Sequence, residues 1–433
     1  SVMMKKIGIL NCSHIYNYGS VLQSYAMEKV VGEITGYDTY SVRYRQKKGL
    51  RYIKNYFPLI FEKDIVKFKL KGVKRKIYIK FINKSLGENC KKREHYFQKF
   101  VNDNFNFTET YTTINELNKM SLEYSKFVLG SDQVWHPINY GSHYYTMEWI
   151  PEQIKKITYA ASFGVSNIPK YQIKGTKKFL GRIDNISVRE QQGAQIVYDM
   201  INKKVPVVVD PTLLLDSDMW GGISANIQDK DYIFCYFLGD NKMAREMAIA
   251  MKKKTGKKIF SIPCMDEINL EDLKFGDKQL YDVGPSEFLS YIKNAAYVIT
   301  DSFHGTVFSV LFNKQFVVYN RYNNKNKNSY QYNYDKGMSS YQNKDYDDAI
   351  RYLTKASKLS DGRKNVDLKY TLYQCYAATD NTDMSTEVLK DILSFDENNE
   401  KALKALASIY NTKKDGTSLN KLIKDYKNKD GYR

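Results

Sequence analysis

Short, near-continuous apolar runs alternate with helical segments over the first 320 residues, and this alternation constrains the fold more than any other feature. Strands that are covered on both faces read as unbroken apolar runs, and strands separated by helices form parallel sheets. We therefore predict an α/β fold. The predicted strands are Lys6–Leu10, Lys126–Leu129, Lys156–Ala160, Ile186–Val188, Val205–Val209, Tyr232–Phe237, Lys258–Ser261, Tyr297–Thr300 and Phe316–Tyr319.

Composition changes divide the chain into parts. Gly221 and Gly222 lie in a polar stretch that separates two α/β halves, predicted at 1–220 and 221–325. Asn, Lys and Tyr dominate after residue 321 without an apolar period, which predicts a linker at 326–336. A small all-α domain of helical repeats is predicted at 337–433.

The helical repeats are indicated by a period of about 34 residues. Tyr341, Tyr376 and Tyr410 are 35 and 34 residues apart. Small residues at Gly337 and Ala349 allow two helices to pack closely. This period and residue pattern resemble the tetratricopeptide repeat, so a protein partner is expected to bind the repeats.

Positive charge is concentrated in one segment. The chain has 67 Lys and Arg against 48 Asp and Glu, a net charge of +19. Residues 43–93 contribute 18 basic and three acidic residues, or 18 − 3 = +15. With aromatic and aliphatic residues at helical spacing, this predicts a basic helical insertion at about 44–100. Residues 44–93 would contact an anionic membrane or glycan carrier rather than nucleic acid; the alternative is a solvated insertion.

The five cysteines are scattered, with no CxxC pair. Neither a disulfide framework nor a metal site is predicted, and reduced thiols are typical of the cytoplasm. No apolar run approaches the roughly 20 residues of a membrane span. We expect a cytoplasmic protein, and the inner face of the cell membrane is a candidate location for it.

Polar residues follow two of the predicted strands, where open α/β sheets bind ligands. Asn17, Gly19 and Ser20 follow the first strand and could turn a helix N-terminus toward an anion. Asp132 and Gln133 follow the strand at 126–129, and their amide and carboxylate suit sugar hydroxyls. A strand–helix turn and a helix cap are the structural alternatives.

Two further strand ends carry a cation and a histidine. Arg189 follows Ile186–Val188 and could bind a phosphate or carboxylate, although an ion pair with Glu190 is an alternative. His304 follows Tyr297–Thr300 and lies between Ser302 and Gly305 at a helix N-terminus. A histidine there can give or take a proton next to an anionic ligand.

Six ordered segments between residues 6 and 321 resemble the polysaccharide pyruvyl transferase family. They are NYGSVLQSYA, LGSDQVW, YAASFG, SVREQQGA, DPTLLL and TDSFHGTVFSVLF. The resemblance implies two Rossmann-like halves that face a cleft, as in GT-B glycosyltransferases. It also implies transfer of pyruvate from phosphoenolpyruvate to a sugar diol of a cell-surface glycan or its lipid-linked precursor. The product is a ketal and phosphate is released.

The resemblance also assigns roles to residues. His304 is the general acid that protonates the methylene carbon, and Arg189 holds one anionic end of phosphoenolpyruvate. No cofactor is implied beyond this donor. The predicted substrate-binding residues are Asn17, Gly19, Ser20, Asp132, Gln133, Ser302, Gly305, Arg321 and Lys325. Two alternatives stay open: a GT-B glycosyltransferase that uses a nucleotide sugar, and a repeat-bearing adaptor with a vestigial catalytic half.

Overall fold

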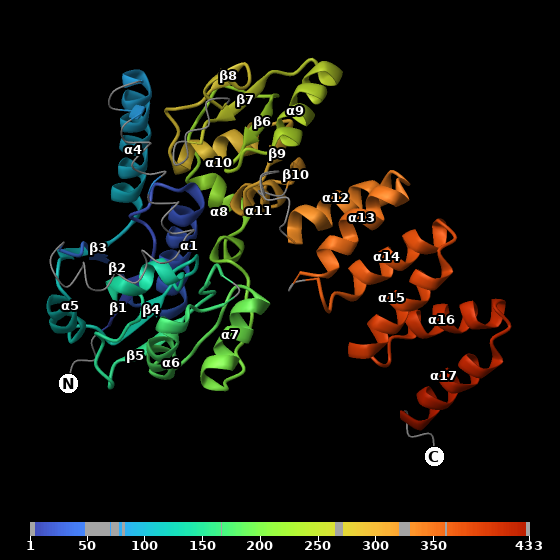
Figure 1. Ribbon diagram of the computed structural model, residues 1–433. Coiled ribbons are helices and arrows are strands. Elements are labelled where there is room, and N and C mark those ends of the chain that lie inside the picture. The colour runs from blue at the N-terminus through green and yellow to red at the C-terminus, as the bar shows by residue number, and fades with distance from the viewer. Residues whose placement is uncertain are drawn as a thin grey trace. The chain divides into compact units, whose positions relative to one another are not determined.

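The chain divides into two compact units (Figure 1). The computed structural model describes residues 5–47, 70, 78–79, 83–165, 167–264, 272–319, 330–359 and 362–429. The first unit contains two α/β halves and extends to residue 320, except for 239–241; the second contains the remaining helices. Most of the predicted basic insertion, and both Arg321 and Lys325, lie outside the described residues.

The first half is built on a parallel sheet of five strands in the order β3-β2-β1-β4-β5. This order places β1 at the centre, between β2 and β4, and makes a switch of winding direction between β1 and β4. The strands are β1 (Lys6–Leu10), β2 (Asp38–Tyr44), β3 (Phe107–Tyr111), β4 (Lys126–Leu129) and β5 (Lys155–Thr158). The helices are α1 (Tyr18–Thr35), α4 (Lys84–Asn104), α5 (Ile114–Ser121), α6 (Ile173–Gly181) and α7 (Gln191–Ile201), with short 3₁₀ turns η3 (Pro137–Ser142), η4 (Lys170–Gln172) and η5 (Pro211–Leu214).

The second half repeats this architecture with a parallel sheet in the order β10-β9-β6-β7-β8. Its central strands are apolar and fully buried, which explains why the sequence indicates them clearly. The strands are β6 (Ile233–Tyr236), β7 (Ile259–Ile262), β8 (Lys278–Gln279), β9 (Tyr297–Thr300) and β10 (Gln315–Val318). The helices are α8 (Ser217–Gly222), α9 (Lys242–Thr255), α10 (Pro285–Asn294) and α11 (Phe303–Leu311), with η6 (Asp272–Lys274).

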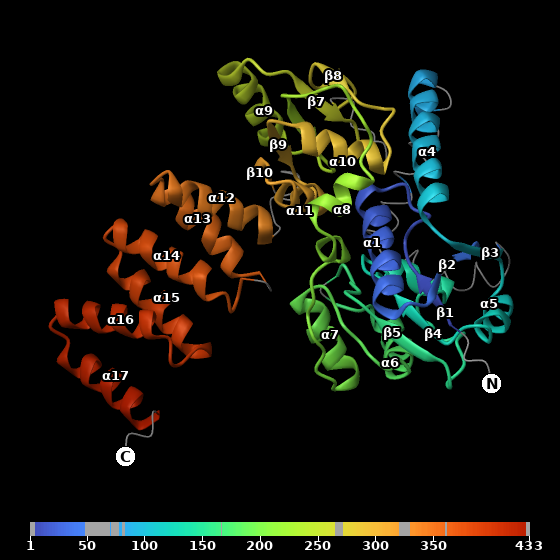
Figure 2. The same cartoon turned by 180° about the vertical axis from the view of Figure 1, so that it is seen from behind.

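Helix α1 of the first half packs against the second half. Figure 2 shows it between the first sheet and helices α10 and α11. Its buried residues Tyr18, Val21 and Leu22 share one apolar cluster with Phe288 and Phe308. Tyr18 stacks on Phe288 with ring centroids 4.5 Å apart, and its hydroxyl donates to the Val283 carbonyl at 2.9 Å. The two halves are therefore joined by a shared core close to the first strand–helix turn.

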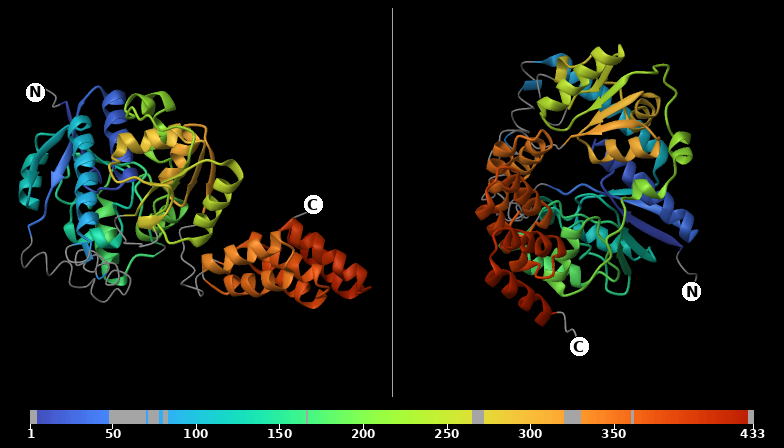
Figure 3. Two further views of the ribbon diagram at one scale, coloured as in Figure 1. Left: turned by 90° about the horizontal axis from the view of Figure 1, so that it is seen from above. Right: turned by 90° about the vertical axis from the view of Figure 1, so that its right-hand side faces the viewer.

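The second unit consists of helices in consecutive antiparallel pairs, stacked side by side (Figure 3). They are α12 (Tyr330–Gln342), α13 (Tyr346–Ser357), α14 (Val366–Ala378), α15 (Thr382–Phe395), α16 (Glu400–Thr412) and α17 (Gly416–Lys429). Ala349, one of the small residues predicted to let two helices pack closely, is fully buried, and so is Ala356 on the same helix. The prediction of a linker at 326–336 is wrong for 330–336, which belong to α12. Tyr330, Tyr334 and Met338 recur every four residues and pack on the repeat core, a period hidden by the intervening Asn and Lys residues.

The predicted fold class is confirmed: two parallel α/β halves precede an all-helical region. Strands β1, β4 and β9 occupy the predicted residues. The strands predicted at 186–188 and 205–209 form only isolated bridges, Ala161↔Val188 and Val188↔Val207. No helix among the described residues is long and apolar enough to cross a membrane.

Candidate active site

His304 lies where the strand ends of the two halves meet. It stands in the first turn of α11, and its side chain is 11% exposed. Its Nε2 lies 3.5 Å from Oδ2 of Asp210, a residue of the first half. On the other side of the ring is Gly19, where an added Cβ would stand 1.9 Å from His304 Nδ1. The imidazole of the second half is thus held between two residues of the first.

The local sequence sets the position of His304. Ser302 caps α11, because its Oγ accepts from the amide of Gly305 at 3.2 Å. Gly305 allows the helix to approach the end of β9 closely: a Cβ there would stand 2.6 Å from Thr300 Oγ1. Both predicted binding residues therefore have a structural role that directs the first turn, and with it His304, toward the first half.

Asp210 is the hub of the site, and its side chain is fully buried. Its Oδ1 accepts from the amide and the hydroxyl of Thr212 at 3.1 and 2.7 Å, and its Oδ2 accepts from Ser131 Oγ at 3.2 Å. Burial by itself would raise the pKa of Asp210. His304, Arg189 and the Thr212 amide outweigh burial and hold the pKa well below its usual range. The carboxylate is consequently ionised at neutral pH.

Arg189 lies beside the same carboxylate. Its Nη1 donates to Asp210 Oδ2 at 3.0 Å. Nη2 is 3.8 Å from Asp132 Oδ1 and Nε is 3.9 Å from Glu190 Oε2, which are ion-pair contacts beyond hydrogen-bond distance. The predicted alternative of an ion pair between Arg189 and Glu190 is thus present, but the distance from Arg189 to Asp210 is shorter. The longer contacts leave N–H groups of the guanidinium able to bind an anion.

Asp132 and Ser20 complete the cluster on the side of the first half. Ser20 Oγ donates to Asp132 Oδ2 at 2.6 Å, which connects the turn after β1 to the turn after β4. Asp132 has a φ of 73°, in the left-handed region, which aspartate tolerates better than most residues. The structure therefore brings together five of the predicted residues, counting Gly19, Ser20, Asp132, Arg189 and His304.

Two predicted residues have other local contacts. Asn17 caps α1, with its Oδ1 accepting from the Ser20 amide at 3.2 Å. The side chain of Gln133 is exposed and lies against Gly164, where an added Cβ would stand 2.7 Å from it. The contact of Asn17 matches the structural alternative of a helix cap.

Three helix N-termini surround the cluster. Asn17 precedes α1, Glu190 directly follows Arg189 and precedes α7, and Ser302 precedes α11. Helix N-termini carry partial positive charge and free amides. They offset the three carboxylates of Asp132, Glu190 and Asp210, which outnumber the cations of the described site. In the described residues, no group of three or more His, Cys, Asp or Glu could hold a metal ion.

Asp210 and Phe303 were missed by sequence reasoning. Asp210 belongs to the DPTLLL segment, and its position before a proline at the start of η5 was the available signal. Phe303 is 48% exposed, and its ring centroid lies 5.2 Å from the Arg189 guanidinium. The Phe303 and His304 ring centroids are 4.9 Å apart, with the ring planes at 83°. A search for polar residues at strand ends does not detect an exposed aromatic residue that lies beside a cation.

Two Rossmann-like halves in one unit, with His, Arg and a buried Asp where their strand ends meet, define a GT-B-like α/β protein. The family described as polysaccharide pyruvyl transferase matches residues 17–324, and the chain belongs to this family. The family supports a transferase that modifies polysaccharides. The description "Tetratricopeptide repeat" matches residues 340–409.

The solved structures that match this chain do so at low sequence identity and with TM-scores below 0.5. UDP-N-acetylglucosamine 2-epimerase from Rickettsia bellii is 10% identical, with a TM-score of 0.41, over 90% of this chain and 96% of the other. The UDP-GlcNAc 2-epimerase of Methanocaldococcus jannaschii is 14% identical, with a TM-score of 0.36, over 72% and 83%. ADP-heptose LPS heptosyltransferase II of E. coli is 9% identical, with a TM-score of 0.31, over 72% and 84%. A comparison with curated proteins found no match.

Proposed function

We propose that the protein transfers pyruvate from phosphoenolpyruvate to two hydroxyls of a sugar in a cell-surface glycan or its lipid-linked precursor. The observation that supports this most is the position of His304 between Gly19 and the ionised Asp210. A histidine that is fixed on both sides, next to an arginine, suits proton transfer to a bound anion. The family membership supports the same class of reaction.

The proposed reaction begins with protonation of the methylene carbon of phosphoenolpyruvate by His304. This makes a methyl group and leaves C2 cationic. The first sugar hydroxyl attacks C2 and loses its proton, the C2–O bond to phosphate breaks, and the second hydroxyl closes the ketal. Of the two protons that the diol loses, one replaces the proton given by His304 and the other leaves with phosphate. Asp210 orients the imidazole and stabilises positive charge next to it.

Arg189 is the proposed anchor for one anionic end of the donor. Its ion-pair contacts with Asp132 and Glu190 are long enough to be exchanged for a phosphate or carboxylate oxygen, while the contact with Asp210 remains. The N-termini of α1 and α11 contribute amides on either side. Arg321 or Lys325 is proposed as the second cation that the charge of the donor requires.

The test is an assay of phosphate release and product mass. The full chain is incubated with phosphoenolpyruvate and a set of sugars, sugar phosphates and lipid-linked sugars. The expected product is heavier by one pyruvate less one water. His304→Gln should lower turnover by about 10²–10⁴-fold, the usual contribution of a general acid. His95→Gln, which alters an exposed histidine on α4, should leave turnover unchanged.

Other results would contradict the proposal. Absence of phosphate release with every acceptor would reject the reaction. Binding of a nucleotide sugar in calorimetry, with no binding of phosphoenolpyruvate, would favour a glycosyltransferase instead. Full turnover in His304→Gln would reject the role of His304 even if the reaction occurs. Deletion of residues 334–433 distinguishes two cases. An adaptor would no longer bind its protein partner, whereas an enzyme would keep its turnover.

A further inference from the structure

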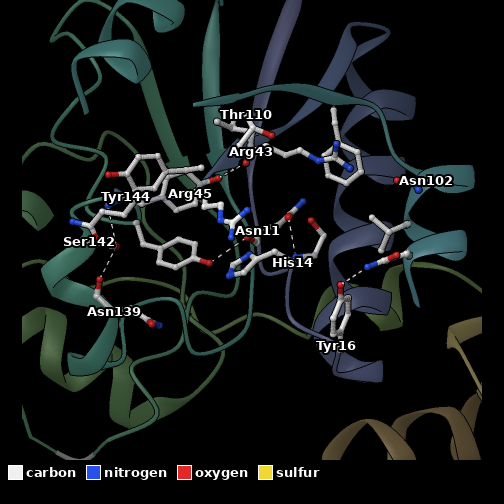
Figure 4. Close-up of a pocket in the computed structure, with 18 residues that line it drawn as sticks. Asn11, His14, Tyr16, Arg43, Arg45, Asn102, Thr110, Asn139, Ser142 and Tyr144 are labelled. Carbon is white, nitrogen blue, oxygen red and sulfur yellow. Dashed lines mark hydrogen bonds between the residues drawn. The ribbon is translucent and has the colours of Figure 1, made fainter. Parts of the chain in front are cut away.

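A pocket of about 680 Å³ opens at the carboxyl edge of the first sheet, next to the charged cluster (Figure 4). Residues that follow β1, β2 and β4 line it, including Asn11, Arg45 and Tyr144. The other lining residues come from the end of β2, from β3 and from α4. This edge is where open α/β sheets place their ligands. The volume is several times what a three-carbon donor needs, and it suits a larger substrate.

Two arginines supply positive charge to this pocket. Arg43, the next-to-last residue of β2, stacks on Phe107 with 3.6 Å between its guanidinium and the ring centroid. Arg45 follows the end of β2, is exposed, and lies between Tyr144 and His14 in Figure 4. In the described part of the chain, neither has a carboxylate within ion-pair distance. Arginines without an acidic partner among the described residues, one of them stacked on an aromatic ring, are suited to bind phosphate.

Neutral groups of fixed orientation form the rest of the wall. The Tyr144 ring stacks on Tyr44 with 5.4 Å between centroids, and its hydroxyl donates to the Val42 carbonyl at 2.7 Å. Asn11 is 4% exposed, and its Nδ2 donates to Ser41 Oγ at 2.7 Å. Tyr144 is only 5% exposed, so it and Asn11 fix the shape of the wall. The exposed neutral groups of the lining are an aromatic ring and two amides, those of Tyr16, Gln98 and Asn102. Such groups match a sugar ring, which has apolar C–H faces and hydroxyl edges.

A hydrogen bond and the course of the chain connect this wall to the cluster around His304. Asn139, which lines the pocket, donates from Nδ2 to the Gln133 carbonyl at 2.9 Å, and Gln133 is the neighbour of Asp132. Asn11 and Tyr16 of the wall belong to the segment that joins β1 to α1, and Gly19 and Ser20 of the cluster stand in the first turn of α1. The pocket and the cluster are thus adjoining parts of the same sheet edge.

We propose that this pocket binds the acceptor as a phosphorylated sugar, with the phosphate on Arg43 and Arg45 and the sugar ring against the exposed neutral groups of the lining. The assignment to the acceptor rests on the proposed function; the ligand chemistry follows from the pocket. The phosphate fixes one end of the sugar, so that its remaining hydroxyls extend toward Asp132 and His304. A free sugar lacks this anchor and binds more weakly.

The experiment is calorimetry on the full chain with a panel of hexose and N-acetylhexosamine 1-phosphates, the corresponding free sugars, inorganic phosphate and phosphoenolpyruvate. At least one sugar phosphate should bind ten-fold or more tightly than its free sugar and than inorganic phosphate. The R43Q/R45Q variant should lose at least ten-fold in affinity for that ligand and keep its affinity for phosphoenolpyruvate. If the double variant folds poorly because Arg43 no longer stacks on Phe107, Arg45→Gln alone is measured instead. It alters an exposed position and should also lower the affinity for the sugar phosphate.

The control variant neutralises two charges elsewhere in the same half. Lys155 and Lys170 are exposed, and Lys155 opens β5 at the opposite edge of the sheet. K155Q/K170Q should change the affinity less than two-fold. The proposal is overturned if no sugar phosphate binds more tightly than its free sugar. The proposal is also overturned if R43Q/R45Q keeps the wild-type affinity for the sugar phosphate. The same holds if this variant loses as much affinity for phosphoenolpyruvate as for the sugar phosphate. Binding that requires both arginines, with no binding of phosphoenolpyruvate, would retain the pocket and reject the proposed donor.

Discussion

The backbone of Gly19 lies against the imidazole of His304, so closely that a methyl group on Gly19 would stand 1.9 Å from Nδ1 and 2.4 Å from Cγ. These residues are far apart in the chain and belong to opposite halves. The helix that begins at Tyr18 therefore sets the position of the histidine as directly as α11 does. A requirement for glycine at this position follows from the contact between halves, since Gly19 does not have a positive φ.

Gly19→Ala should displace the His304 ring and lower turnover by about ten- to a hundred-fold, within the usual contribution of a general acid. Alanine favours a helix by about 1 kcal/mol over glycine, whereas overpacking costs about 1–3 kcal/mol, so the unfolding free energy should fall by no more than about 2 kcal/mol. Turnover and thermal unfolding of the same samples test this. Gly181→Ala, at a helical position with open space around it, is the control and should keep full turnover. Equal activity of both variants would show that the ring tolerates displacement.

Asp210→Asn should lower the unfolding free energy by about 3–5 kcal/mol at neutral pH, because it removes the charge that compensates Arg189 in a buried setting. The pKa of Asp210 is depressed in the folded state, so its contribution is present above the unfolded pKa of about 4. It is lost as the pH falls below that value. The difference between wild type and variant should therefore shrink below about pH 4.

Urea unfolding followed by tryptophan fluorescence measures this difference, because Trp135, Trp149 and Trp220 all belong to the first unit. Asp199→Asn is the matched control. It alters an exposed acid of α7 and should shift the free energy by less than about 0.5 kcal/mol. A difference that persists unchanged at pH 3 would mean that Asp210 acts through hydrogen bonds rather than charge.

Sequence patterns predicted the strands that are buried on both faces and missed those that alternate. Strand β6 reads IFCY and β9 reads YVIT, and such runs have few other interpretations. Strand β2 reads DTYSVRY, with Thr39 and Ser41 buried among apolar neighbours. Ser41 is satisfied by hydrogen bonds with Asn11 and Glu28, partners that only the folded chain provides. A buried polar residue of this kind gives no periodic signal.

The site was predicted as single residues, and its connections could not be predicted. The pattern of strand ends indicated Arg189 and His304 as candidates, because a cation or a histidine there suggests a direct chemical role. Their common partner Asp210 follows a segment that forms only an isolated bridge. Asp210 therefore does not lie at the end of a regular strand, and the pattern of strand ends could not indicate it. The pocket between Arg45 and Tyr144 depends on the winding order of five strands, which a single sequence does not specify.

Arg93 on α4 joins the halves at a second place. It is 7% exposed, and its Nη1 and Nη2 donate to the carbonyls of Pro263 and Leu280 at 3.0 and 3.1 Å. Arg93→Leu leaves both buried carbonyls without these donors and should destabilise the first unit by about 2–4 kcal/mol. Arg93→Lys should recover only part of the loss, because one ammonium cannot replace the planar fork. Unfolding in urea, with the exposed Lys92→Leu as control, measures the effect; equal stability of Arg93→Leu and wild type would contradict it.

Gly337 in the repeats, like Gly19 in the first unit, allows a close approach that a larger residue would prevent. An added Cβ would stand 2.5 Å from Leu353 Cγ, and Leu353 is fully buried on α13. Gly337→Ala should separate α12 from α13 and destabilise this pair by up to about 2 kcal/mol, the excess of overpacking over the gain in helix propensity. Hydrogen exchange should then accelerate in peptides from 330–357 and stay unchanged in the α/β unit. Gly416→Ala, at the open start of α17, should keep the exchange of 330–357 as in the wild type. Unchanged protection in Gly337→Ala would show that the two helices can move apart without loss of stability.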